Sequence, residues 1–511
     1  MEVNENHSKS WFPLIIIACA SFIIALDSTF MNVAISTLVQ DLNTSLSTIQ
    51  AIITFYTLIT ASLMLIGAKL QDIFGKKKIF MIGAFLFGCG TLIASLSNSA
   101  GTLFIGWSLL EGVGGAFMTP ATISLVSGTY KGKDRTLALA VVSAMAGIAA
   151  AIGPLFGGVL TTYASWRAGF LVELLIVIFV LVFRGKIQEL ETTLSKSDFD
   201  IYGSILFIIT LVTFILGILS LHMFNLHLTS FILVLSLVFL ILFVLYENRR
   251  TKKGKEPLLK LELFKNRTLD ISFVVRLLAA LALAGTIFAV SIFLQTILKT
   301  DPFTTGLALM PLTVGLLLFS MVTPRLASKF SHKTVIMIGL VLAIIGSLLL
   351  RGQFGLGVGI WDISPGMFLV GAGVGFVFAL GTDIALNGVE SKDESSASGL
   401  ITTGNMLGSS MGTAIIGVLI IVGAAYGFYE GVGLYTDYNI TQDEVLDDFN
   451  IYIEHMNDVE INQLQGVSSA SAEIANQILY DAMKLAFDLI TVLFVICLII
   501  SPFSKKYENK D

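Results

Sequence analysis

The sequence predicts an all-α membrane protein with fourteen transmembrane helices, arranged as two pseudo-symmetric six-helix bundles plus two inserted helices, with both termini in the cytoplasm. Three observations predict this fold class: an apolar composition, fourteen apolar runs of spanning length, and an internal repeat. Of the 511 residues, 55% are hydrophobic and only 13% are charged, and the mean hydropathy is +0.86. Soluble domains carry about a quarter charged residues, so this composition indicates an integral membrane protein.

The apolar runs define the elements in order, because about 20 apolar residues suffice to cross a bilayer as a helix. The first run lacks the short apolar core and small-residue cleavage site of a signal peptide, so we expect it to stay in the mature protein. Cys19, Cys89 and Cys497 lie inside runs and indicate no disulfide framework. The predicted runs are 11–37, 47–68, 79–98, 101–126, 137–163, 167–184, 201–221, 228–246, 270–297, 304–324, 334–351, 364–388, 399–425 and 482–502.

The Lys and Arg residues give the orientation, because basic residues are retained in cytoplasmic loops. With the N-terminus inside, 26 of the 31 Lys and Arg residues fall in cytoplasmic segments. Merging or splitting a single run would scramble this alternation, so the even number of spans and the cytoplasmic termini follow. Eleven acids gather in one predicted external loop, 426–481, which contains no Lys or Arg. The net charge of −5 therefore does not suggest an acidic partner-binding surface.

An internal repeat predicts the two bundles. Residues 68–77 align with 324–333, each after the second run of its unit, and Gly112-Val-Gly114 is echoed by Gly373-Val-Gly375. Duplicated halves are the layout expected of alternating-access carriers. The seventh and eighth runs contain no charged residue before Glu247 and form an insert between the units. The predicted divisions are an N-terminus 1–10, a first bundle 11–184, linkers with the inserted helices 185–269, a second bundle 270–502 and a C-terminus 503–511.

Asp27 in the first run and Glu111 in the fourth are candidate proton or cation sites. An acid near the middle of a bilayer costs about 2.5–3.5 kcal/mol on insertion scales and usually faces a partner or a watery cavity. Burial disfavours the charged carboxylate, so we expect Asp27 to exchange protons near neutral pH. The alternative for both acids is a structural carboxyl group hydrogen-bonded to neighbouring helices. Asn32, five residues after Asp27, could make an interhelical hydrogen bond.

Other charged residues inside the runs are weaker candidates. Arg276 lies about two turns into the ninth run, where it could take part in transport or could extend its charged end toward the cytoplasm. Glu173 is expected nearer the outer end of its helix, and Asp488 nearer the inner end of its helix. Two mid-membrane acids in one half of the protein favour a proton or cation site there.

The fifth run carries a face almost without side-chain bulk. Gly153 and Gly157 are four residues apart, Gly158 follows, and Pro154 lies among them. Such a face lets another helix backbone approach closely in lipid, and Pro154 removes a backbone donor and bends or loosens the turn before it. The pattern suits a helix that packs against a moving partner, and static close packing is the alternative.

The turn after the second run combines an acid with several lysines. Asp72, Gly75, Lys76 and Lys77 lie between two spanning runs, where Gly75 permits a tight reversal. An acid in a basic turn requires a partner, and Arg135, or a neighbouring lysine in the next cytoplasmic loop, could supply it. The alternative is a loop whose lysines only keep it on the cytoplasmic side of the membrane.

Together these residues resemble the major facilitator superfamily, and specifically its fourteen-helix drug:proton antiporter family. The resemblance covers essentially the whole chain and includes the Leu26–Asn32 segment, the turn at Asp72–Lys77 and the Gly-Pro-Leu-Phe-Gly-Gly element at 153–158. Further matches are Trp166-Arg167, Glu256-Pro257-Leu258, Leu263-Phe264 and the long loop before the last run. One position departs from the family, because Ser108 stands where its members usually carry an Arg.

The resemblance implies transport by two bundles around a central cavity. It implies that Asp27 is protonated and deprotonated during the cycle. It further implies that Asp72, Gly75, Lys76 and Lys77 lock the outward-facing state, with Arg135 as a partner. The glycine element of the fifth run would act as a hinge and seal the outer side.

The sequence therefore predicts a proton-driven exporter of amphipathic or cationic organic compounds in the plasma membrane. We expect a monomer in the lipid bilayer with a small-molecule substrate, no nucleic acid, and no cofactor or metal besides the proton gradient. A carrier or uniporter for a lipid, peptide or metabolite is an alternative, as is a sensor or scaffold that uses the acidic external loop. An enzyme is not expected, because the chain has no Gly-Lys-Ser/Thr phosphate loop and its five histidines are scattered.

Overall fold

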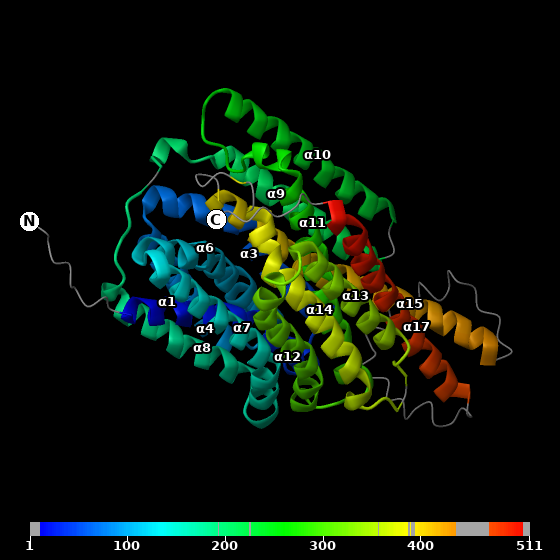
Figure 1. The fold of residues 1–511 in the computed structure, drawn as a ribbon. Coiled ribbons are helices and arrows are strands. Elements are labelled where there is room, and N and C mark those ends of the chain that lie inside the picture. The colour runs from blue at the N-terminus through cyan, green and yellow to red at the C-terminus, as the bar shows by residue number, and fades with distance from the viewer. Residues whose placement is uncertain are drawn as a thin grey trace, which may run out of the picture.

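The computed structural model describes residues 11–192, 194–223, 226–355, 357–386, 389, 394–435 and 470–503. The predicted N-terminus, most of the predicted external loop and nearly all of the predicted C-terminal segment lie outside the described residues. Every regular element in the described part is helical, and fourteen helices are long and apolar enough to cross a membrane (Figure 1). The predicted all-α fold with fourteen spans is confirmed, and the cytoplasmic placement of the termini stays a prediction.

The first bundle is formed by the first six spans. Its helices pack on one another within the bundle, with α1 against α7 and α8, and α4 against α6 and α8. The elements are α1 (Phe12–Phe30), η1 (Met31–Val33), α2 (Ile35–Asp41), α3 (Leu46–Phe74), α4 (Lys76–Ser95), α5 (Ala100–Leu103), η2 (Phe104–Glu111), α6 (Gly112–Thr129), α7 (Gly132–Tyr163), α8 (Trp166–Val182) and η3 (Phe183–Lys186).

The second bundle is formed by the last six spans. Its core joins α11, α12, α13, α14 and α17 in one apolar cluster. The elements are α11 (Arg267–Ile292), η7 (Phe293–Ile297), α12 (Pro302–Ala327), α13 (His332–Arg351), α14 (Ile360–Leu386), α15 (Glu394–Tyr435), α17 (Ala470–Ile500) and η9 (Ser501–Phe503).

The insert forms a helical pair on one flank of the molecule. The helices α9 and α10 lie side by side (Figure 1), and α9 packs against both α3 and α15. It therefore covers the line along which these two helices, one from each bundle, meet. The insert elements are η4 (Lys196–Asp198), α9 (Ile201–Leu219), η5 (Ser220–Met223), α10 (Leu226–Lys252) and η6 (Leu261–Lys265).

The two ends of the molecule differ, and we name them by their turns. The basic end holds the turn between α3 and α4 at Gly75, where φ is +101°. The distal end holds the turn between α7 and α8, where Ser165 caps α8 by accepting a hydrogen bond from the Arg167 N–H. Because successive spans alternate in direction, the starts of α11 and α13 also lie at the basic end, and the starts of α12, α14 and α17 at the distal end.

Two predicted runs differ from the helices that form. The run 11–37 is not one helix, because the chain leaves α1 at Phe30, passes through η1 and resumes as α2. Just before this break, the side chains of Ser28, Thr29 and Asn32 donate hydrogen bonds to backbone carbonyls of the preceding turn, which competes with the regular helical pattern. The last helix begins at Ala470, earlier than the apolar run at 482, because polar residues such as Gln477 lower hydropathy without preventing helix formation.

Candidate functional site

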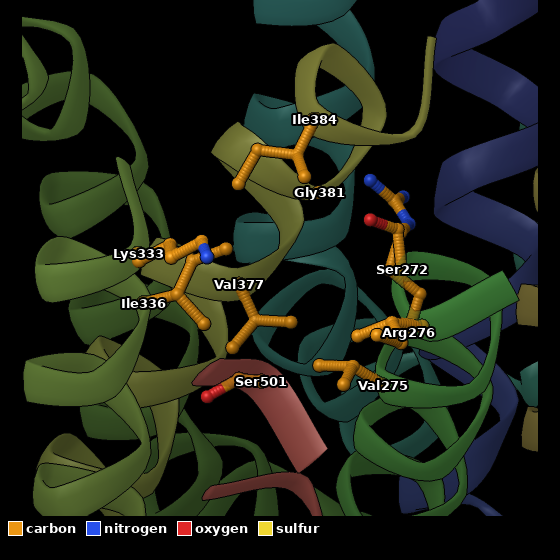
Figure 2. Close-up of a pocket in the computed structure, with 10 residues that line it drawn as sticks. Ser272, Val275, Arg276, Lys333, Ile336, Val377, Gly381, Ile384 and Ser501 are labelled. Atoms are coloured by element: carbon orange, nitrogen blue, oxygen red, sulfur yellow. The ribbon is translucent and has the colours of Figure 1, made fainter. Parts of the chain in front are cut away.

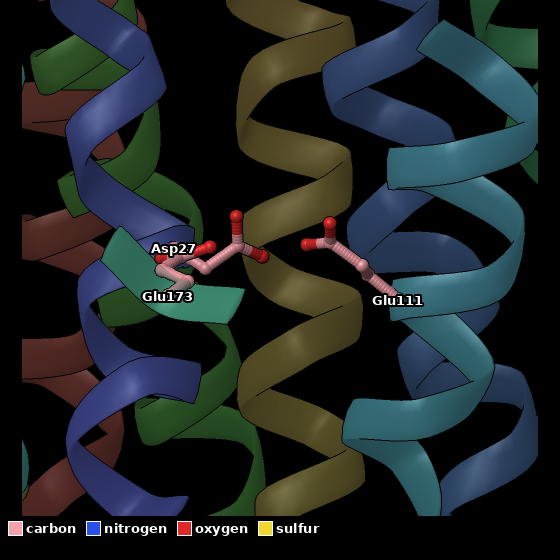
Figure 3. A group of neighbouring side chains, drawn as sticks. All are labelled: Asp27, Glu111 and Glu173. Atoms are coloured by element: carbon pink, nitrogen blue, oxygen red, sulfur yellow. The ribbon is translucent and has the colours of Figure 1, made fainter. Parts of the chain in front are cut away.

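Three fully buried carboxyl groups meet inside the first bundle. Asp27 comes from α1, Glu111 from the last position of η2, and Glu173 from α8, and each is 0% exposed. One oxygen of each acid lies within 4.8 Å of an oxygen of both others. Figure 3 shows Glu111 extending from its helix toward Asp27 and Glu173. We call these residues the carboxyl triad.

A local distortion and two glycines place Glu111 in the triad. The segment Phe104–Glu111 is a π-helix, which adds a residue to the turn and rotates the side chains that follow; such bulges occur frequently at functional sites. Gly90 on α4 faces this turn, and a Cβ there would lie 2.7 Å from Glu111 Cγ. Gly106 lets the same two backbones touch, because its Cβ would lie 2.6 Å from Ala94 N. Glycine at these positions therefore makes room for the Glu111 side chain.

The triad has few hydrogen-bond donors around it. The Trp107 Nε1–H donates to Asp27 Oδ1 at 2.9 Å, and the Tyr56 ring stacks on Trp107 with 5.4 Å between the ring centroids. Asp27 Oδ2 and all four carboxyl oxygens of Glu111 and Glu173 are buried without a hydrogen-bond partner among the described residues. Asp27 is therefore the acid with a fixed N–H donor.

Charge repulsion limits how the triad can ionise. Two carboxylates about 5 Å apart repel by about 3–4 kcal/mol at an effective dielectric constant near 20. Adding a third charge adds two such pairs, and no donor compensates for Glu111 or Glu173. Full ionisation would require a neutralising cation, which three oxygens at this separation are close enough to share. If no cation is bound, one or two of the three carboxyl groups must carry a proton.

The structure thus brings together two of the predicted site residues. It adds Glu173, which was named but placed elsewhere, and Trp107, which was not among the candidates. Asp27 and Glu111 converge, whereas the Asn32 side chain donates to backbone carbonyls of its own helix, to Thr29 O at 3.3 Å. Glu173 was noticed as a buried acid but was placed nearer the outer end, apart from the others. Its depth in the membrane could have identified Glu173, because Asp27 also lies toward the distal end of its helix, three residues before Phe30.

Ser108 occupies the place where the resembling family carries an Arg. Its hydroxyl donates to Ile52 O at 2.8 Å, and the residue is fully buried. Ser108 therefore joins η2 to α3 through a backbone contact and brings no positive charge to the triad.

The glycines of α7 form a seam between the two bundles at the distal end. On one side Gly153 and Gly157 contact Thr29 and the Phe30 carbonyl of α1. On the other side a Cβ at Gly158 would lie 2.6 Å from Pro302 O of α12, and one at Gly306 of α12 would lie 2.5 Å from Pro154 O. The helix continues through Pro154. The structure packs the small-residue face closely against α1 and α12, and the movement of this face stays a prediction.

A second seam at the same end joins α3 to α15. The Gln50 side chain donates to Thr413 O and Ala414 O at 3.2 and 3.3 Å, and Ser410 donates to Thr54 O. Nearby, Gln295 of η7 accepts from Ser36 N and donates to Asn32 O, both at 3.0 Å. These hydrogen bonds between the bundles lie in the distal half, so the distal end is closed.

Arg276 is buried inside the second bundle, whereas the triad lies inside the first. Its guanidinium donates to Phe378 O at 2.9 Å and to Asn405 Oδ1 at 3.3 Å, and Gly381 leaves room for its side chain. It lines a small pocket at the basic end together with Lys333 (Figure 2). The structure therefore places Arg276 among helices of its own bundle.

The turn at the basic end is held by an acid that the sequence analysis did not single out. Glu189, in the segment after α8, accepts hydrogen bonds from the backbone N–H groups of Lys77 and Lys78 at the start of α4. A carboxylate at a helix N-terminus is stabilised by the helix dipole. Gly75 gives the space, because a Cβ there would meet the Glu189 carboxyl group at 2.9 Å. The neighbouring Lys76 is half-buried, and Glu189 thus fastens the predicted loop motif to the end of the bundle.

The predicted pairing of Asp72 with Arg135 stays a prediction. Asp72 is half-buried, and its backbone carbonyl accepts a hydrogen bond from Leu194 N. Arg135 lies exposed on the first turns of α7.

An ionic network ties the linker before α11 to both α3 and the insert. Lys69 Nζ lies 2.8 Å from Glu256 Oε1, and Arg250 donates to the Glu256 backbone carbonyl at 2.8 Å and pairs with Asp200 at 3.2 Å. Burial raises the pKa of Glu256, but the hydrogen bond and charge of Lys69, with the charge of Lys260, outweigh it, so this pKa lies below its usual value. The Glu256-Pro257-Leu258 element therefore docks the linker.

Ion pairs at the distal end correct one prediction. Asp488 of α17 pairs through both oxygens with Arg351, the last residue of α13. Because α13 ends at the distal end, Asp488 lies on the distal side of α17 and not near the basic end, where it was predicted. Asp488 is only six residues after the distal start of the predicted run 482–502, and its ion pair with Arg351 holds it on that side. Arg167 similarly binds Asp41 and the Ser97 carbonyl.

Fourteen helices of spanning length, packed as two six-helix bundles and an inserted pair, define a multi-pass membrane protein, and three buried acids lie inside the first bundle. The sequence profile of the Major Facilitator Superfamily matches residues 17–198 and 199–413. The chain belongs to the Major Facilitator Superfamily, whose members are transporters and not enzymes. Its fourteen spans and its relatives fit the predicted fourteen-helix drug:proton antiporter family.

Named relatives and one solved structure agree with this assignment. The probable actinorhodin transporter of Streptomyces coelicolor is 29% identical over 421 residues, 81% of this chain and 73% of that protein. The multidrug efflux pump LfrA of Mycolicibacterium smegmatis is 27% identical over 414 residues, 81% of both chains. A bacterial homologue of the human lysosomal transporter Spinster, solved in an inward-facing and unoccupied conformation, has a TM-score of 0.65 and 13% identity, over 96% of this chain and 97% of that chain. This last likeness concerns the fold alone.

Proposed function

We propose that the protein is a secondary active exporter of amphipathic or cationic organic compounds, driven by proton entry. The observation that carries the proposal is the carboxyl triad, in which five of the six carboxyl oxygens have no hydrogen-bond partner among the described residues. Such buried acids inside a helical bundle are expensive and typical of ion and proton pathways. The relatives support the class of cargo, since they include a multidrug efflux pump and the puromycin resistance protein pur8 of Streptomyces alboniger, 28% identical over 80% of this chain and 81% of that protein.

In the proposed cycle, protons and substrate compete for one negative site. A proton binds a carboxyl oxygen of Asp27 or Glu111 from the distal side and is released at the basic side. Loss of the proton leaves a carboxylate, which attracts a cationic compound from the basic side. A ligand shifts a conformational equilibrium only by its different affinity for the two states, and this competition supplies that difference.

The proposed orientation places the basic end in the cytoplasm and the distal end outside. The lysines around Gly75 support it, because basic residues are retained on the cytoplasmic side. The seams close the distal end, which supports the interpretation that a substrate enters this conformation from the basic, cytoplasmic end. We further propose that the protein works as a monomer in the plasma membrane, without bound cofactor or nucleic acid.

Asp27→Asn tests this function in reconstituted vesicles with an imposed pH gradient and a panel of dyes and antiseptics. We expect the wild-type protein to accumulate compounds against their gradient, and we expect the variant to fold but lose this proton-driven export. Glu262→Gln is the matched control, because Glu262 is exposed in the linker and its side chain is 73% exposed. Wild-type transport by Asp27→Asn would refute the role of Asp27.

The same vesicles separate the other candidate functions. Wild-type protein that equilibrates a dye without gradient-driven accumulation is a uniporter, to which the uncharged Ser108 would correspond. A protein that moves none of the compounds, but moves a lipid, peptide or metabolite, is a carrier of another cargo. Deleting residues 432–468 should leave transport intact in a carrier, whereas a sensor or scaffold would lose its role.

A further inference from the structure

We propose that Glu173 is a second proton-carrying group, so that the carboxyl triad exchanges two protons per transport cycle, one on Glu111 and one on Glu173. The inference deepens the proposed proton antiport and rests on it. No part of the sequence pattern distinguished Glu173 from a structural acid, and only the meeting of three helices gives it this role.

The first step is the unequal surroundings of the three acids. Asp27 receives the Trp107 N–H at 2.9 Å and is also faced by the Tyr56 hydroxyl. Glu111 and Glu173 have no donor on either carboxyl oxygen among the described residues. A buried carboxylate needs donors, so the negative charge in the closed state belongs on Asp27. Of the two acids in the proposed cycle, Glu111 is therefore the one that binds the proton.

The second step is what the two glutamates do when they are protonated. Each then has an O–H group, and one oxygen of each acid lies within 4.8 Å of an Asp27 oxygen. Small side-chain rotations let both O–H groups donate to the Asp27 carboxylate, whose Oδ2 lacks a partner. Two protons thus leave a single negative charge on the triad and give the Asp27 carboxylate two further donors.

The third step is the release of both protons. Charges at this separation repel about four times more weakly in water than at an effective dielectric constant near 20. When the basic end opens, water and a cationic compound enter, and both glutamates can ionise. The groups that face the triad are Tyr56 on α3, Trp107 on η2 and Thr91 on α4, none of which is charged at neutral pH.

The experiment uses the cationic dye ethidium in reconstituted vesicles. The concentration gradient of ethidium at which its net flux stops gives the number of protons exchanged per ethidium. Vesicles are clamped at zero membrane potential with a pH difference of one unit, for which each coupled proton contributes a tenfold gradient. We expect about 100-fold for the wild-type protein and about 10-fold for Glu173→Gln, because one carrier is lost. Glu262→Gln is the control and should match the wild type.

A second measurement needs no transport. Infrared titration of purified protein detects the carbonyl stretch of protonated carboxyl groups, and we expect Glu173→Gln to remove one titrating band while Glu262→Gln leaves that band in place. A wild-type gradient of about 10-fold, or an unchanged gradient in Glu173→Gln, would overturn the inference, as would loss of the bands on adding Ca²⁺ or Mn²⁺, which would indicate a metal site. A wild-type protein that accumulates no ethidium under the pH gradient would instead overturn the proposed function, so the two failures are distinct.

Discussion

Replacing Gly306 of α12 with alanine tests whether the α7–α12 seam holds the distal end closed. A Cβ there would lie 2.5 Å from Pro154 O and 3.0 Å from the Pro154 carbonyl carbon. Ordinary contacts begin at 3.4 Å, so the backbones must separate by about 1 Å in a close-packed seam. Overpacking of this kind costs about 1–3 kcal/mol. That energy shifts the equilibrium about 5- to 150-fold toward an open distal end.

Spin-label distances across the distal end report this shift. Leu96 at the end of α4 and Trp361 at the start of α14 are 67% and 73% exposed, and they lie in different bundles. Labels on cysteines at these positions, in a chain without its three native cysteines, give a distance distribution by pulsed electron resonance. We expect Gly306→Ala to add a longer distance at the expense of the shorter one.

The matched control is Gly147→Ala on the same seam. Its Cβ would lie 3.3 Å from Leu317 Cδ1, the end of a side chain that can move. The control should therefore keep the wild-type distances. An unchanged distribution in Gly306→Ala would mean that the seam does not hold the distal end closed, and the reasoning from backbone contact would be wrong.

Two further predictions concern the triad and the linker. Trp107→Phe removes the N–H donor of Asp27. A hydrogen bond to a charged group is worth about 1.5–3 kcal/mol, so gradient-driven export should fall at least tenfold. The control Trp166→Phe removes a comparable hydrogen bond to Asp41 at the distal end and should not lower export. Glu256→Gln should speed hydrogen exchange of residues 253–266 at pH 7. The pKa of Glu256 lies below its usual value, so its pairing with Lys69 contributes its full stabilisation of docking at pH values above the usual pKa. The stabilisation is lost as the pH falls through the lowered pKa. The ratio of variant to wild-type rates should approach one in acid, and a ratio of one at pH 7 would contradict the assigned contact.

The fold could be predicted because hydropathy and basic residues act on whole segments. All fourteen runs became spans, since each buries its backbone polar groups by forming a helix. The boundaries were harder to predict. The break after Phe30 depends on side chains that bond to the backbone of their own turn, and the start of the last helix at Ala470 lies in polar sequence that hydropathy does not detect.

The candidate site could be predicted only in part, because it depends on rotation about helix axes. Asp27 and Glu111 stand out as acids in apolar runs, and the structure brings them together. Glu173 joins them because Gly169, one turn earlier on α8, receives the Phe30 ring and brings α8 against α1. Trp107 turns toward Asp27 inside a π-helix, which has no recognised sequence signature here. Contacts of this kind follow from packing rather than from local pattern.

The last turn of α1 connects the carboxyl triad to the distal seam. Asp27 faces the triad, while Thr29 and the Phe30 carbonyl lie against Gly153 and Gly157 of α7. These positions are separated by about 3–5 Å along the helix axis. A rotation or shift of this turn that follows proton loss at the triad must therefore change the contact with α7, because a seam without side chains has no flexible atoms to absorb it. The other face of α7 packs on α12 of the second bundle through Gly158 and Gly306. A continuous path of contacts thus runs from the buried acids to the closure between the bundles, and it begins at Asp27 because this acid lies three residues before the distal end of α1.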